Sequence, residues 1–216
     1  MSGDLRERFA ALYTAALTDV LDDRGLREQT LPHELRPLAQ GMRLAGPAFT
    51  VQGRPVDTHD WDAAIRKTLA MLGSVPPGHV AVYACDHDVA AHFGELSATS
   101  LASREVAGCV LDGGCRDVRF IVDLGFPVFS RFVTPEDSTW RWQIEATQVP
   151  VTIGRVRIEP GDWIVADDDG VVAVPAAVAA DVLADAEAKA GTEDRIRAAV
   201  RDGMLPLDAY ERYGTF

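Results

Sequence analysis

The sequence predicts an α/β protein with a partly parallel sheet, a second β-rich layer and flanking helices. Residues 79–84 and 106–111 are short, Val-rich apolar runs that end in polar or glycine-rich turns, and a helix-length segment, 95–104, separates them. The order strand, helix, strand is most economically connected as a parallel βαβ unit. Further short apolar runs with tight turns between them fill residues 149–174 and indicate the second β-rich layer.

The N-terminal segment is predicted to form one amphipathic helix that stops at Gly25. Its apolar residues recur at helical spacing and are Leu5, Phe9, Leu12, Tyr13, Ala16, Leu17, Val20 and Leu21. Residues 27–45 predict a loop with a short strand. They are followed by an expected strand at 48–52 and an expected helix at 61–72, which precedes the turn Pro76-Pro77-Gly78.

Beyond the βαβ unit, residues 118–124 predict a short helix that stops at Gly125, and 127–132 predict a strand. The next expected strands are 149–153, 155–158, 163–166 and 171–174, with turns at Pro160-Gly161 and Asp168-Asp169-Gly170. Two charged helices, 176–190 and 192–201, are expected near the end. Because we find no repeat and no linker, we expect a single domain over residues 1–216.

Composition excludes several classes of protein. The chain has 216 residues, 47% of them hydrophobic, and no apolar run approaches the length that a membrane helix needs. Charges are spread through the first residues, so we expect no signal peptide and a cytoplasmic location. The net charge of −12 argues against nucleic acid as a partner. Three cysteines without CxxC spacing indicate neither a disulfide framework nor a zinc site.

Two loops are expected to meet at the edge of the sheet where ligands of open α/β folds collect. The loop 85–94 leads into a helix that begins at Gly94-Glu95-Leu96-Ser97, and free N–H groups at a helix N-terminus attract anions. The loop 112–116 brings Arg116 and Asp117 side by side. An anion cradle, a guanidinium and a possible metal ligand together predict a site for a small carboxylate.

These motifs resemble the RraA-like family, which contains the regulator of ribonuclease E activity A and the 4-hydroxy-4-methyl-2-oxoglutarate/4-carboxy-4-hydroxy-2-oxoadipate aldolases. The resemblance covers nearly the whole chain and departs from the family pattern at Cys85-Asp86-His87-Asp88 and at Phe93. The residues that carry it are Thr18–Asp22, Gly46-Pro47-Ala48, Gly94-Glu95-Leu96, Val106-Ala107-Gly108, Asp112–Asp117, Leu124–Phe129, Pro160-Gly161-Asp162 and Ala166–Val172.

The resemblance implies a swivelling β/β/α-type domain that assembles as trimers or hexamers, with active sites at subunit boundaries. It implies a class II pyruvate aldolase in which Asp117 binds Mg²⁺ or Mn²⁺ directly and waters supply most of the other ligands. Arg116 would stabilise the pyruvate enolate, and the turn formed by Gly94, Glu95, Leu96 and Ser97 would bind the substrate carboxylate. Substrates would be 4-hydroxy-2-oxo dicarboxylic acids such as 4-hydroxy-4-methyl-2-oxoglutarate, and oxaloacetate would be decarboxylated as a side activity.

Lysine usage agrees with metal chemistry. Only Lys67 and Lys189 are present, in two predicted helices away from the expected site. A Schiff-base aldolase needs a desolvated lysine in its pocket, and the sequence offers no good candidate. If the protein cleaves carbon–carbon bonds, a metal is therefore the expected electron sink.

Each proposed site residue also has a purely structural interpretation. Asp117 would serve as the N-cap of the helix 118–124, Arg116 as a surface ion-pair partner, Glu95 as a first-turn glutamate and Gly94 as the start of its helix. The run 167–170 lacks EF-hand spacing and predicts a hairpin turn. The five histidines, which show no ligand pattern, are His33, His59, His79, His87 and His92. Of these, His87 and His92 lie near the expected site.

Two other functions stay open. One is a non-catalytic, protein-binding regulator of an RNA-degrading enzyme, and the presence of an acid at Asp117 discriminates against it. The other is an enzyme that acts on a different 2-oxo or hydroxy dicarboxylate, with specificity set by the loop Asp86-His87-Asp88.

Overall fold

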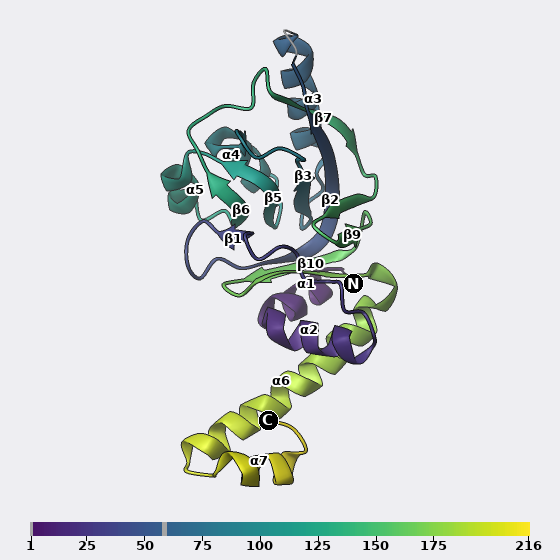
Figure 1. Cartoon of the computed structure of the whole chain (residues 1–216), viewed down its shortest axis with the longest axis vertical. Helices are drawn as coiled ribbons and strands as arrows, with labels where there is room; N and C mark the ends of the chain where they lie inside the picture. The colour runs from purple at the N-terminus through teal and green to yellow at the C-terminus, as the bar shows by residue number, and fades with distance from the viewer. Residues whose placement is uncertain (1, 58–59) are drawn as a thin grey trace.

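The computed structural model describes residues 2–57 and 60–216, so His59 lies outside the described residues. A nine-stranded mixed sheet in the order β1-β6-β5-β3-β2-β10-β11, with β4 beside β5 and β7 beside β2, forms its centre (Figure 1). The strands are β1 (Arg36–Pro37), β2 (Leu44–Pro55), β3 (Val80–Ala84), β4 (Ala91–Phe93), β5 (Gly108–Cys115), β6 (Val128–Val133), β7 (Trp142–Thr147), β10 (Trp163–Asp167) and β11 (Gly170–Val174).

The sheet is partly parallel and nearly closed. β2, β3, β5 and β6 run parallel to one another, whereas β1, β7, β10 and β11 pair antiparallel with their neighbours. The two edges approach each other, because the Leu31 N–H donates to the Val171 carbonyl of β11 at 2.9 Å and Arg36 of β1 donates to the Asp169 carbonyl at 3.0 Å. A separate two-stranded sheet consists of β8 (Val151–Ile153) and β9 (Val156–Ile158).

The predicted βαβ unit is confirmed. β3 and β5 are adjacent and parallel, and helix α4 (Glu95–Ala102) connects them. The strand boundaries differ from the prediction, because β5 continues through the polar and glycine-rich stretch 112–115 that we expected to be a loop. The expected loop 85–94 also contains β4, which pairs with the end of β5. Helix α5 (Val118–Leu124) ends at Gly125 as predicted, in a left-handed conformation with φ 72°.

The prediction of one N-terminal helix is wrong. The chain forms α1 (Ser2–Ala11) and α2 (Thr14–Asp23) with a break between them. Asp167 explains the break: its carboxylate accepts hydrogen bonds from the Thr14 N–H at 2.8 Å and the Thr14 hydroxyl at 2.7 Å. A new helix therefore begins at Thr14, fixed by a residue from β10. Asp167 also pairs with Gly170 in the predicted β10–β11 hairpin.

The C-terminal helices differ from the prediction as well. A short 3₁₀ turn (Ala176–Val178) precedes α6 (Ala179–Arg201), which continues through Gly191 without interruption. A further helix, α7 (Pro206–Tyr213), was not predicted, and neither was β7. In Figure 1, α6 leads away from the sheet and carries α7 at its far end.

Three groups of buried side chains hold the layers together. One lies between the sheet and the helices α3 (Trp61–Ser74), α4 and α5, and a second lies between the curved sheet and β8–β9. The third joins β10 and β11 to α1, α2 and α6. All three cysteines are free and buried. Among the helices of residues 2–57 and 60–216, none is long and apolar enough to cross a membrane.

Candidate functional site

The structure brings Gly94, Arg116 and Asp117 together at the ends of β4 and β5. The Arg116 N–H donates to the Phe93 carbonyl at 3.0 Å, which holds the two segments in register. A Cβ on Gly94 would lie 2.6 Å from Asp117 Oδ2 and 3.2 Å from Arg116 Cγ. Glycine is therefore favoured here, because a side chain would push Arg116 and Asp117 away from the start of α4.

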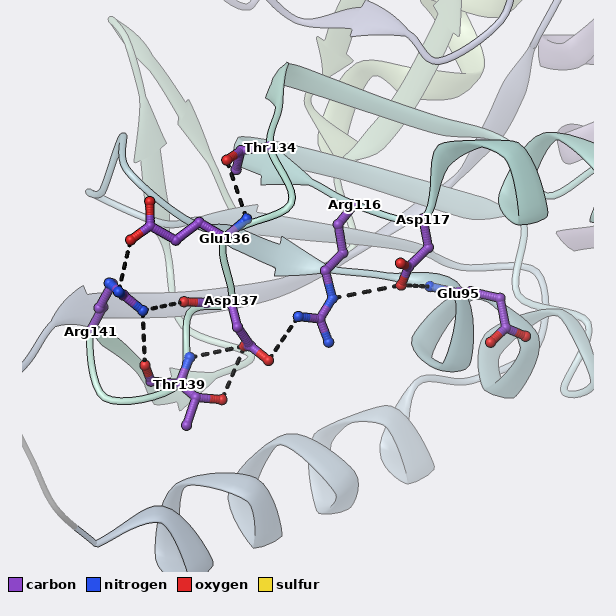
Figure 2. A network of polar contacts seen from close by, with 8 residues as sticks. All are labelled: Glu95, Arg116, Asp117, Thr134, Glu136, Asp137, Thr139 and Arg141. Atoms are coloured by element: carbon purple, nitrogen blue, oxygen red, sulfur yellow. Dashed lines mark hydrogen bonds and ion pairs between the residues drawn. The ribbon is translucent and has the colours of Figure 1, made fainter.

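Asp117 does not use its side chain to cap its own helix. Its backbone is left-handed, with φ 59° and ψ 31°, and α5 has no side-chain cap hydrogen bond from it. Instead, Asp117 Oδ2 accepts a hydrogen bond from the Glu95 N–H at 3.2 Å, at the N-terminus of α4 (Figure 2). Asp117 thus occupies the N-cap position of α5, as the structural interpretation predicted, but its side chain makes no capping hydrogen bond to that helix. Asp and Asn are the non-glycine residues that tolerate this conformation best.

Arg116 lies between two carboxylates. Its Nη1 is 2.8 Å from Asp137 Oδ2, and its Nε is 3.6 Å from Asp117 Oδ2 (Figure 2). Asp137 also accepts hydrogen bonds from the N–H and the hydroxyl of Thr139, at 2.9 and 3.0 Å. Burial raises the pKa of the Asp137 carboxyl, but the Thr139 and Arg116 contacts outweigh burial and hold this pKa below its usual value. Asp137 therefore stays ionised and fixes the guanidinium.

A cavity of about 280 Å³ opens beside Arg116. Gly94 and Ser97 at the start of α4 line it together with Arg116 and Asp137, and residues of α3 and Trp140 also contribute to its wall. Asp117 lines a second, neighbouring cavity of about 360 Å³, which Arg116 also lines. Arg116 consequently borders both spaces and lies between Asp137, which lines the first cavity, and Asp117, which lines the second (Figure 2).

A neutral histidine forms part of the cavity wall. His92 Nδ1 accepts the Gly114 N–H at 3.2 Å, so its Nε2 carries the proton and faces His87 Nδ1 at 3.0 Å. Burial, together with the neighbouring His87, lowers the pKa of His92 to about 3. His92 thus contributes no positive charge to the cavity at neutral pH. Its ring packs edge-on against Trp142, with centroids 4.8 Å apart.

The remaining predicted residues lie on the first turn of α4. Ser97 lines the first cavity, whereas the Leu96 side chain is 81% exposed. Glu95 contributes its backbone N–H to Asp117, and its carboxylate accepts a hydrogen bond from the Thr99 hydroxyl at 2.8 Å. Their roles in binding substrate stay predictions.

Sequence reasoning missed Asp137, Trp61 and Trp140. Asp137 and Trp140 belong to an irregular segment between β6 and β7, and Trp61 begins a helix that we recognised without assigning it to the site. Asp137, Ser138 and Thr139 form a local turn of Asp and Thr side-chain hydrogen bonds, which is a recognisable signal for an ordered loop. No pattern in the sequence connects that loop to Arg116.

Both lysines lie away from the cavity. Lys67 is an exposed residue of α3 and does not line the cavity, and Lys189 of α6 is paired with Asp19 at 3.1 Å. Within the described residues, no amine is therefore placed to form a Schiff base with a substrate at Arg116.

The residues present fit one kind of metal site. Residues 2–57 and 60–216 contain no group of three or more His, Cys, Asp or Glu that could hold a metal, so a site made of protein ligands alone does not fit. The Asp117 side chain is 41% exposed, and its described polar contacts run through Oδ2. Mg²⁺ dehydrates reluctantly and often binds through one or two carboxylates and several waters. A water-rich site on Asp117 suits that preference.

Comparisons with known proteins agree with these features. A family model described as RraA-like, aldolase/RraA, matches residues 14–173. A Halalkalibacterium halodurans protein provisionally named 4-hydroxy-4-methyl-2-oxoglutarate aldolase is 32% identical over 210 residues, which cover 96% of this chain and 93% of that protein. Protein DlpA of Legionella pneumophila is 30% identical over 93% of this chain, and the chain spans only 32% of its length.

A solved structure shows the same fold. It is the crystal structure of Streptomyces coelicolor RraAS2, described as an unusual member of the RNase ES inhibitor RraA protein family. The TM-score is 0.80 with 31% sequence identity, and the match covers 91% of this chain and 97% of that chain. The α/β class with a partly parallel sheet, a smaller second sheet and flanking helices is thereby confirmed.

Proposed function

Since this chain belongs to the RraA-like family, we propose that it is a divalent-metal-dependent carbon–carbon lyase that releases pyruvate from 2-oxo acids. The observation that carries the proposal is the convergence of Arg116, Asp117 and the α4 N-terminus, with Gly94 kept free of a side chain. The guanidinium and the helix N–H groups can bind one small anionic head group, the C1 carboxylate and 2-oxo group of the substrate, and the Asp117 carboxylate can hold a cation beside it. The name of the Halalkalibacterium halodurans relative points to the same chemistry.

The reaction balances without an oxidant or a further reactant. In a 4-hydroxy-2-oxo acid, the electrons of the C3–C4 bond pass to the pyruvate half, which takes up a proton at C3. The 4-hydroxyl loses its proton and becomes the carbonyl of the second product. Oxaloacetate decarboxylation produces the same pyruvate enolate and needs no base for a hydroxyl, so it tests the head-group chemistry alone.

We assign a separate role in catalysis to each of the side chains at the site. Asp137 holds Arg116 Nη1, so that the guanidinium is already oriented when substrate arrives. The remaining Arg116 N–H groups and the first turn of α4 bind the carboxylate and the developing oxyanion of the 2-oxo acid. A divalent cation at Asp117, when bound, supplies positive charge that stabilises the same oxyanion. Gly94 lets the Arg116 and Asp117 side chains lie close to the start of α4.

We also propose that the whole chain is one domain that assembles as a trimer or hexamer. Four apolar side chains on α4, α5 and the end of β6 are exposed around Asp117, and burial in a subunit boundary would remove them from water. They are Leu96, Phe120, Leu124 and Val133.

A second candidate function is regulation of an RNA-degrading enzyme through protein contacts. The likeness to RraAS2, which is described as a member of an RNase inhibitor family, favours it. Under this alternative the Asp117 carboxylate would have only its capping role at α4.

Metal removal tests the proposal. We expect EDTA to abolish pyruvate release from oxaloacetate, and Mg²⁺ or Mn²⁺ to restore it, after subtraction of the rate that the free ion gives without protein. Full activity after rigorous chelation would contradict the metal dependence, and no activity with any metal would favour the regulator.

A further inference from the structure

We propose that the cavity beside Arg116 selects 2-oxo acids whose tail is neutral and apolar or aromatic. The tail is the part of the substrate beyond C4, which leaves in the carbonyl product. This inference rests on the proposed lyase function and narrows it. It also departs from the dicarboxylate substrates that the family resemblance implies.

The charges around the cavity carry the first part of the argument. Of the described residues that line it, only Arg116 and Asp137 bear a charge at neutral pH, because His92 stays neutral. Arg116 is already compensated by Asp137 at 2.8 Å and by Asp117 at 3.6 Å. The remaining N–H groups of Arg116 can bind the carboxylate of the head group. No second described cation lines the cavity to pair with a carboxylate on the tail.

Besides the lack of a second cation, Asp137 would repel a carboxylate on the tail. Its carboxyl has a pKa below the usual value, so it stays ionised over the neutral range and faces the same cavity as the tail. A tail carboxylate would lose water and meet a like charge. Both effects cost free energy, which disfavours dicarboxylates relative to neutral substrates.

The aromatic side chains that line the cavity favour an apolar or aromatic tail. Trp61 at the start of α3 and Trp140 in the loop before β7 line the cavity, and each is 47% exposed. Trp140 has a φ of 73°, a conformation that bulky residues rarely adopt and that persists only where the surroundings enforce it. Ile65 adds an aliphatic side chain one turn along α3. An apolar tail that covers these rings would remove their surface from water.

A binding measurement tests the inference without requiring turnover. 2-Oxo-4-phenylbutanoate and 2-oxoglutarate share the 2-oxo acid head, lack the 4-hydroxyl that cleavage needs, and differ in the tail. In calorimetric titrations with Mg²⁺ present, we expect the phenyl compound to bind about tenfold more tightly or better. Equal affinity, tighter binding of 2-oxoglutarate, or no binding of either compound would overturn the inference.

A charge introduced in the wall provides a matched test. Ile65→Lys places a cation beside the tail and should shift the affinity ratio by about tenfold or more towards 2-oxoglutarate, whereas the uncharged Ile65→Met should keep the preference for the phenyl compound. An unchanged ratio in Ile65→Lys would also overturn the inference. Oxaloacetate decarboxylation by the wild-type protein reports separately on the lyase function, so an incorrect tail assignment is distinguishable from an incorrect reaction.

Discussion

At the scale of single residues, the sequence predicted which residues meet at the site, but not the hydrogen bonds and ion pairs that they form there. The parallel arrangement of β3 and β5 already implied that Gly94, Arg116 and Asp117 would meet. The partner of Arg116 was not predictable, because Asp137 is 21 positions away in an irregular loop and reaches Arg116 only through the tertiary fold. The capping of α4 by Asp117 was equally hidden, since it depends on the left-handed backbone at Asp117.

The shape of the guanidinium matters in this account. Arg116→Lys should lower the kcat/KM for oxaloacetate by about 10²-fold, because one ammonium group cannot contact Asp137 and a substrate oxygen pair as a planar guanidinium does. The measurement is steady-state pyruvate release. Arg119→Lys, on the exposed face of α5, is the matched control and should behave as the wild-type protein. Comparable rates for the two variants would contradict a role for Arg116.

The neutral His92 predicts a pH dependence of stability. The pKa of His92 is about 3 in the folded protein and near 6.5 in the unfolded chain, so the unfolded state binds more protons between these values. Stability should therefore fall as the pH drops below about 6.5, by at most about 1.4 kcal/mol per pH unit from this residue.

His92→Asn removes the titrating group and can still accept the Gly114 N–H. The fall in melting temperature between pH 7 and pH 5 should be shallower in this variant than in the wild-type protein. The exposed His33→Asn is the control and should keep the wild-type slope. Parallel curves for wild type and His92→Asn would show that His92 is not held neutral by the fold.

At the scale of elements, periodicity predicted most helices and strands, and tertiary contacts decided where several of them end. The N-terminal apolar pattern runs continuously through Leu12 and Tyr13, so it carries no sign of the break that Asp167 imposes at Thr14. β5 extends through Asp112 and two glycines, residue types that strands usually avoid, because β4, β3 and β6 pair with it. β7, in contrast, does alternate: the apolar Trp142, Ile144 and Ala146 are interleaved with polar residues, a strand signal that we did not use.

Asp167 should consequently be a strong determinant of stability. Asp167→Ala leaves the buried N–H and hydroxyl of Thr14 without their acceptors and should lower the free energy of unfolding by about 1–3 kcal/mol. Urea unfolding measures the change. Asp169→Ala, an exposed position in the same turn, is the control and should cost far less. A loss no greater than that of the control would show that the Thr14 contact does not hold α2.

At the scale of the whole molecule, the fold explains why the site lies where it does. Parallel strands direct the ends of β4 and β5 to one edge, and α4 begins there, where Asp117 accepts the Glu95 N–H. The helices α1, α2 and α6 pack on β10 and β11, and the small sheet β8–β9 packs inside the curved sheet. The protein could therefore change its substrate preference through α3 and the loop before β7 while the head-group site stays the same.

The central claim is that Asp117 anchors a divalent cation for carbon–carbon bond cleavage. The most direct measurement is oxaloacetate decarboxylation as a function of Mg²⁺ concentration in wild-type protein, Asp117→Asn and the exposed control Asp123→Asn. Asn tolerates the left-handed backbone and can still accept the Glu95 N–H, so Asp117→Asn should melt near the wild-type temperature. We predict that its Mg²⁺-dependent rate falls about 10²-fold or more, while the control saturates as the wild-type protein does. An Mg²⁺ curve for Asp117→Asn that overlays the wild-type curve would contradict the account.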